Sequence, residues 1–169
     1  MSLPWKDPHP PLPDNHQLSL KRLQGLLQRL RHDSKILFEY DSIIKEQERL
    51  GIIEKVELGE VDELPRENLH YLPHHAVVRQ DKETTKVRVV YDASARSDGP
   101  SLNDCLHPGP KFDQRIFDLL LRFRVHRVAL IVDIEKAFLM VSVAKDDRNS
   151  LRFLWIDDVL REKPEVITF

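Results

Sequence analysis

A single carboxylate follows the most apolar segment of the chain. The run Val128–Val132 is entirely aliphatic, and Asp133 comes directly after it, ahead of Ile134. An ionised carboxylate among apolar side chains is costly unless a cation or hydrogen-bond donors meet it. One interpretation is therefore a metal ligand at the end of a central strand. The other is a turn residue, or a cap on a short helix at Glu135, and the residues alone leave both open.

A charged loop and the strand after it form a second candidate site. Lys82 lies in the polar stretch 80–85, and Arg88 lies within the alternating stretch 86–91. On a strand, Arg88 faces the side opposite Val87 and Tyr91. A guanidinium group there is suited to bidentate contact with a phosphate. The alternative is a hairpin whose charged side chains are simply solvated.

Other reactive residue types lack a supporting arrangement. Asp157 and Asp158 are adjacent acidic residues, but their setting is typical of a turn. His74 and His75 would point to opposite sides of a strand, which favours structural or solvated roles over metal binding. Cys105 is the only cysteine, so an internal disulfide and a cysteine-cluster zinc site are excluded.

The elements that must position these residues follow from periodicity. Residues 1–14 are rich in proline, which predicts an extended arm. Apolar side chains recur at helical spacing over 16–30 and again over 34–50. Asn15 is the predicted N-cap of the first helix, and the second helix is predicted to start at Asp33 or Ser34.

After Gly51, which is placed to cap the second helix, the pattern changes to strands and turns. The predicted strands are 52–56, 76–79, 86–91, 128–134, 139–143 and 151–155, of which the last three would form one sheet. A long loop is predicted over 94–110, and Asp113 is predicted to cap a third helix. This order of elements predicts an α+β protein.

Composition and charge limit the partners. The 169 residues are 41% hydrophobic and 32% charged, which suits one globular domain or slightly more. The net charge of −2 gives no global bias toward polyanions, so any such site must be local. Two basic clusters are candidates: Lys21, Arg22, Arg29 and Arg31, and Arg122, Arg124, His126 and Arg127. The absence of a signal peptide and of a membrane-spanning run predicts an intracellular, cytoplasmic protein with no membrane partner.

Several segments resemble, in family order, the reverse transcriptases of BEL/Pao-type LTR retrotransposons. The stretch Val128–Phe138 is similar to the first catalytic motif of reverse transcriptases: an apolar strand, Asp, an apolar residue, two polar residues, Ala and Phe. Segments similar to the BEL/Pao branch itself are 3–6, 10–15, 71–78, 91–95, 100–106 and 151–155. The resemblance therefore covers nearly the entire chain.

The resemblance implies a magnesium site. Asp133 would bind both Mg²⁺ ions of the complete enzyme, and the backbone carbonyl of Ile134 would contribute a further ligand. Two metal ions would activate the primer 3′-hydroxyl and stabilise the leaving pyrophosphate. The implied partners are an RNA or DNA template-primer and deoxynucleoside triphosphates (dNTPs).

The same resemblance implies a nucleotide site. Arg88 and a loop lysine, Lys82 or in another register Lys86, would grip the incoming triphosphate. Phe138, next to Ala137, would stack under the sugar and exclude a 2′-hydroxyl group, so that deoxynucleotides are selected.

The implied fold is a partial right-hand polymerase, with an arm over 1–14, a fingers-like region over 15–112 and the start of a palm over 113–169. A complete palm also has a helix motif and a Tyr-x-Asp-Asp hairpin, and neither occurs here. We therefore expect a fragment of an RNA-directed DNA polymerase that is inactive alone. The alternatives are an enzyme seen only in part, and a non-catalytic nucleic-acid-binding or protein-interaction module derived from one.

Overall fold

The computed structural model divides the chain into two units. One unit joins residues 1–107 to 143–169, and the other comprises 108–142. The residues that the structure describes are 1–56, 69–79, 87–110, 115–125, 127–130, 132, 134 and 136–169. The division into a fingers-like region and a palm remains a prediction.

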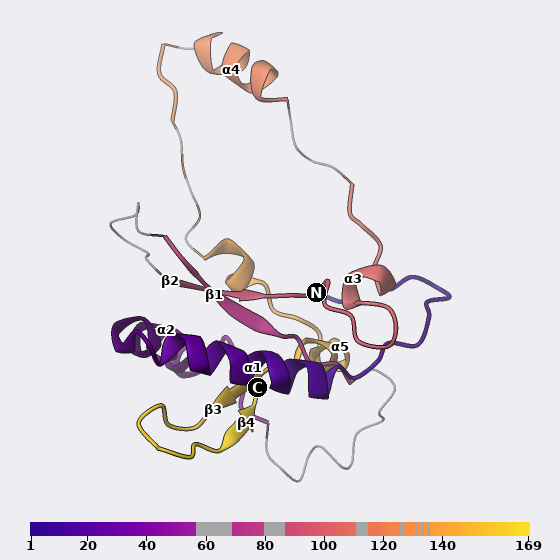
Figure 1. Cartoon of the computed structure of the whole chain (residues 1–169). Helices are drawn as coiled ribbons and strands as arrows, with labels where there is room; N and C mark the ends of the chain where they lie inside the picture. The colour runs from indigo at the N-terminus through magenta and orange to yellow at the C-terminus, as the bar shows by residue number, and fades with distance from the viewer. Residues whose placement is uncertain are drawn as a thin grey trace. The chain divides into compact units, whose positions relative to one another are not determined.

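The first unit is a mixed α+β assembly, as the order of elements predicted (Figure 1). Its helices are α1 (His16–Leu30), α2 (Ser34–Arg49), α3 (Leu102–Cys105), α5 (Lys145–Arg148) and the 3₁₀ helix η3 (Asn149–Leu151). Its strands form two antiparallel pairs, β1 (His74–Val78) with β2 (Val87–Tyr91) and β3 (Leu154–Ile156) with β4 (Val166–Thr168). The predicted pair of N-terminal helices and the predicted hairpin after them are confirmed.

The two long helices lie where the apolar spacing predicted them, but their N-termini differ. Asp33 caps α2, because its carboxylate accepts hydrogen bonds from two backbone N–H groups of the first turn. Asn15 holds the N-cap position of α1 with a φ of 57°, and its side chain makes no capping bond. Its amide donates instead to the carbonyl of Ala95, and the carboxylate of Asp14 accepts from the N–H of His16. The predicted N-cap position of Asn15 is confirmed, but its side chain makes no capping bond.

The segment after α2 is a turn rather than a strand. Gly51 has a φ of 67°, the left-handed conformation that commonly follows a helix. The N–H groups of the next two residues bond back to the carbonyl of Gln47. The predicted strand over 52–56 is therefore wrong, because the backbone at its start closes the helix instead of pairing with a neighbour.

A hydrophobic core joins the two long helices to both hairpins. Helix α1 contacts β1 and β3, and α2 contacts β2 (Figure 1). The buried core side chains are Leu23, Leu26, Leu30, Leu37, Tyr40, Ile44, Tyr71, Val87, Phe153, Leu154, Trp155, Ile156 and Phe169. Burial of each large apolar side chain stabilises the fold by roughly 1.5–3 kcal/mol. The core therefore fixes the β1–β2 hairpin on a rigid base.

The proline-rich arm, residues 1–14, forms no helix and packs against other parts of the first unit. The carboxylate of Asp147 accepts hydrogen bonds from the backbone N–H of Leu3 and the indole N–H of Trp5, both at 2.8 Å. Further along, Nδ1 of His70 lies 2.6 Å from the carbonyl oxygen of Pro13. Residues 1–14 are thus held at both ends by buried polar side chains.

The second unit contains α4 (Ile116–Val125) and the 3₁₀ helix η2 (Ala137–Met140). Helix α4 confirms the predicted third helix, whereas its predicted cap Asp113 lies outside the described residues. No residue of α4 is buried.

The predicted three-stranded palm sheet is not formed by the described residues. Residues 128–130, 132 and 134 have no strand structure, and η2 occupies the start of the predicted strand 139–143. A strand needs a neighbour to pair its backbone groups, and no partner is found among the described residues of this unit. The third predicted strand, 151–155, is displaced, because β3 begins at Leu154 and pairs with β4.

Candidate functional site: a groove beside an unpaired strand edge

The β1–β2 hairpin presents Arg88 on its outer face. Val77 lies opposite Arg88, and His74 lies opposite Tyr91. Arg88 is exposed, whereas its neighbour Val87 is only 1% exposed and packs in the core. The predicted alternation of the second strand is therefore confirmed.

The predicted polymerase residues lie in different parts of the chain. Those outside the described residues are Asp133, Lys82 and Lys86. Ile134, Ala137 and Phe138 belong to the second unit, whereas Arg88 belongs to the first. Ala137 and Phe138 are consecutive in η2, and the Phe138 side chain is 95% exposed. Ile134 is 71% exposed and lies outside any strand.

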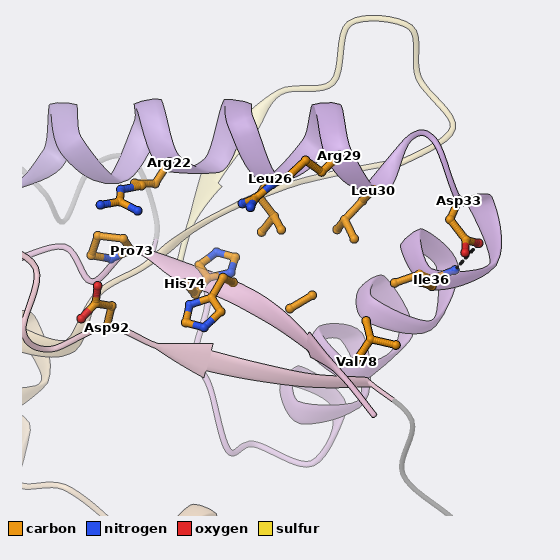
Figure 2. A pocket seen from close by; sticks show the side chains of 12 residues that line it. Arg22, Leu26, Arg29, Leu30, Asp33, Ile36, Pro73, His74, Val78 and Asp92 are labelled. Atoms are coloured by element: carbon orange, nitrogen blue, oxygen red, sulfur yellow. Dashed lines mark hydrogen bonds between the residues drawn. The ribbon is translucent and has the colours of Figure 1, made fainter. Parts of the chain in front are cut away.

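A groove of about 440 Å³ lies between α1 and β1 (Figure 2). Its lining residues are Arg22, Leu26, Arg29, Leu30, Asp33, Ile36, Pro73, His74, His75, Ala76, Val78 and Asp92. Figure 2 shows Leu26 and Leu30 pointing from α1 toward β1. Its volume falls within the range of about 300–1,000 Å³ that is common for ligand pockets.

The unpaired edge of β1 borders this groove. The N–H of Asp92 donates to the carbonyl of Pro73 at 2.8 Å, so these two residues form a hydrogen-bonded pair of the ladder. In an antiparallel ladder such pairs alternate, so the odd-numbered residues of β1 bond to β2. The backbone N–H and C=O groups of Ala76 and Val78 therefore point away from β2. Within the described part of the chain, no other strand pairs with that edge.

The α1 wall of the groove is cationic. Arg22 and Arg29 are both exposed, and neither forms an ion pair with a described residue. The two acidic residues of the lining are already engaged, because Asp33 caps α2 and Asp92 accepts hydrogen bonds from Ser94. Nε of Arg29 donates to the carbonyl of Gly25, and the other guanidinium N–H groups of the two arginines are available to an acidic ligand.

A buried polar network lies beneath β1. Nε2 of His74 lies 2.8 Å from the carbonyl oxygen of Leu154, and Nδ1 lies 2.5 Å from the hydroxyl of Tyr40. A carbonyl only accepts, so Nε2 carries the proton and Nδ1 accepts from Tyr40. Burial lowers the pKa of His74 to about 4. His74 is thus a neutral structural residue that holds β1 against β3.

His70 and Cys105 are also buried, and their surroundings favour structural roles over reactive ones. His70 is fully buried, and burial lowers its pKa below the usual value. Cys105 is also fully buried, and burial raises the pKa of its thiol, which opposes thiolate formation. Among the described residues, no group of three or more His, Cys, Asp or Glu side chains is placed to hold a metal ion.

The acidic pair after β3 is confirmed as part of a turn. Asp157 accepts a hydrogen bond from the N–H of Glu165 across the β3–β4 connection. Asp158 accepts one from the N–H of Leu160. Both carboxylates therefore organise local backbone.

Sequence reasoning identified Arg22 and Arg29 only as members of a basic cluster. Their spacing of seven residues places them on one side of a helix, with Leu26 and Leu30 close to the same side. That spacing indicates one side of α1 that carries both basic and apolar side chains. The strand edge that completes the groove depends on contacts far apart in sequence.

No protein-family model, no curated protein and no solved structure matches this chain. None of the described helices has both the length and the apolar character needed to cross a membrane.

Proposed function

We propose that this chain is part of an RNA-directed DNA polymerase of a BEL/Pao-type retrotransposon and supplies its fingers and the start of its palm. The observation that carries the proposal is the β1–β2 hairpin, which presents Arg88 to solvent at the position that the family resemblance gives to a triphosphate-binding arginine. In this role Arg88, with Lys82, contacts the phosphates of an incoming dNTP.

The packing of the hairpin supports this role. Val87 is buried in the core, and Val89 packs against it from the same face of β2. Arg88 therefore projects from a backbone that is fixed on both sides. A planar guanidinium group on a rigid strand loses less conformational entropy when it forms two bonds to a phosphate.

The proposed catalytic centre is incomplete within these 169 residues. Asp133 is the proposed magnesium ligand, with Ile134 as a backbone ligand and Phe138 as the sugar-selecting residue. Two ions about 4 Å apart need more than one carboxylate to hold them. Loss of several kcal/mol of transition-state stabilisation lowers the rate by three or more orders of magnitude. The chain alone is therefore expected to be inactive.

A primer-extension assay with the purified chain, Mg²⁺ and all four dNTPs is expected to show no incorporation of nucleotides. Incorporation that is abolished by Asp133→Asn would contradict this expectation, because it would show that these residues hold a working centre.

Nucleotide binding tests the proposed role of Arg88. A fluorescent dNTP with Mg²⁺ is expected to bind the chain, and Arg88→Ala is expected to weaken binding at least fivefold by removing a bidentate phosphate contact. Arg31→Ala is the matched control, since Arg31 is an exposed arginine at the end of α1. Absence of binding up to about 1 mM nucleotide, or equal loss in both variants, would refute the role.

A further inference from the structure

We propose that the groove between α1 and β1 binds an extended segment of a partner polypeptide. The segment joins β1 as an added strand and places acidic side chains near Arg22 and Arg29. This binding does not depend on the polymerase assignment, because none of the proposed polymerase residues lines the groove.

The unpaired strand edge supplies the first recognition element. Ala76 and Val78 each present one N–H donor and one C=O acceptor on the side away from β2. An exposed edge of this kind is a template for pairing with another chain. Addition of a strand satisfies donors and acceptors together, as in other β-augmentation complexes.

The apolar part of the lining supplies the second element. Leu26 and Leu30 form a floor that is already almost fully buried, and Ile36 and Val78 beside it keep exposed apolar surface (Figure 2). Alternate side chains of an added strand point to the same face. Every second residue of the partner would therefore contact this apolar lining, and the residues between them would face solvent or the arginines.

The two arginines select for charge. They are seven residues apart on α1, which corresponds to about 10 Å along the helix axis. Side chains two and four positions apart on one face of a strand are separated by about 7 Å and about 13 Å. The arginine side chains are long and flexible enough to bridge the difference of about 3 Å between the helix spacing and either strand spacing. An acidic strand is therefore complementary to this wall of the groove.

The groove favours a polypeptide over a nucleic acid. A phosphodiester backbone offers acceptors to the two guanidinium groups, but it carries no donor for the edge carbonyls of Ala76 and Val78. The partly exposed apolar side chains of Ile36 and Val78 would also remain uncovered by a phosphate backbone. A peptide backbone satisfies both requirements.

The proposal is tested with a capped eight-residue peptide of alternating valine and glutamate. Titration of the ¹⁵N-labelled chain is expected to shift the amide resonances of Ala76 and Val78. Hydrogen exchange of these two amides is expected to slow at least fivefold at saturation, because they become bonded. The same peptide N-methylated at every residue cannot form these bonds and is the negative control.

Variants made in pairs separate the contribution of the arginine charges to peptide binding from that of the β1 strand edge. Arg22→Ala with Arg29→Ala is expected to weaken peptide binding at least fivefold. Lys21→Ala with Arg31→Ala removes the same charge from positions outside the groove and is expected to change binding less than twofold. Ala76→Pro removes an edge donor that β2 does not use, and it is expected to reduce binding while the circular dichroism spectrum is retained.

Three outcomes would overturn the proposal. The first is no binding of the alternating peptide up to 1 mM, and the second is equal binding of its N-methylated form. The third is a preference for a single-stranded oligonucleotide that the Arg22 and Arg29 variant abolishes. Since Arg88 is unchanged in every variant, failure here leaves the nucleotide-binding test of the proposed function intact.

Discussion

His74 makes the stability of the first unit sensitive to acid. Its folded-state pKa of about 4 lies below the ordinary value of 6.5, because burial disfavours the charged ring. The unfolded chain therefore binds the proton first, and stability is lost as the pH falls from about 6.5 toward 4. Since one pKa unit corresponds to 1.36 kcal/mol, we expect a loss of roughly 2 kcal/mol between pH 7 and pH 4.5. Urea unfolding at both pH values measures it.

The contribution of His74 to the pH dependence of stability is measured by comparing variants of His74 and of the neighbouring His75. His74→Gln is expected to lower stability at pH 7 and to reduce this pH dependence, while the acid sensitivity that comes from His70, whose pKa burial also lowers, remains. His75→Gln is the matched control, because His75 is exposed on the same strand. An unchanged pH dependence in the His74 variant would show that another group carries the acid sensitivity.

Tyr40 and Tyr91, whose hydroxyl groups are both buried, should respond differently to loss of those groups. The hydroxyl of Tyr40 donates to Nδ1 of His74, so Tyr40→Phe leaves a buried acceptor unpaired and should cost about 1–3 kcal/mol. The buried hydroxyl of Tyr91 has no hydrogen-bond partner in the described part of the chain. Tyr91→Phe should therefore be neutral or stabilising by up to about 1 kcal/mol. Thermal unfolding compares the variants, and similar losses in both would refute this account.

At the scale of elements, one carboxylate anchors the start of the N-terminal arm. Asp147→Ala removes the acceptor for Leu3 and Trp5 and should cost about 1–3 kcal/mol. It should also expose the bond after Lys6 to trypsin and raise the initial cleavage rate at least tenfold. Asp146→Ala is the control, since Asp146 is an exposed neighbour in α5. Equal cleavage of the two variants would mean that other contacts hold the arm.

Helices were easier to predict from sequence than strands, for a physical reason. The apolar stripe of α2 and its start at Ser34 are local features, and both are confirmed. Strand pairing depends on distant partners, so the apolar run at 128–134 predicted a strand that the described residues do not form. Helix α3 was missed, although Ser101 and Asp104 form a capping box whose spacing is visible in the sequence.

The candidate sites likewise divide into those that local sequence predicts and those that depend on contacts between distant residues. The outward direction of Arg88 follows from strand alternation and was predicted, because it needs only local information. The groove was not predicted, since it requires α1 to lie beside an edge of β1 that is about 50 residues away in the sequence. Asp133 and Lys82 lie outside the described residues, and their roles stay predictions.

At the scale of the whole molecule, the two units should differ in local stability. Side chains of α2 and β3 lie in the core of the first unit, whereas α4 buries none of its residues. An isolated helix of ten residues is marginal in water, because nucleation costs more than so few hydrogen bonds return. Amides of α4 should therefore exchange at close to unfolded rates, while those of α2 and β3 should report the global free energy of unfolding.

Hydrogen exchange at two protein concentrations measures this difference. Protection of α4 equal to that of α2 at low concentration would contradict it, because α4 would then unfold only with the first unit. Protection that appears only at high concentration would show that a second copy covers side chains such as Phe117, which is 69% exposed in the single chain. The core contacts of α2 would be unchanged in that case, so the stability of α4 would depend on concentration while that of the first unit would not.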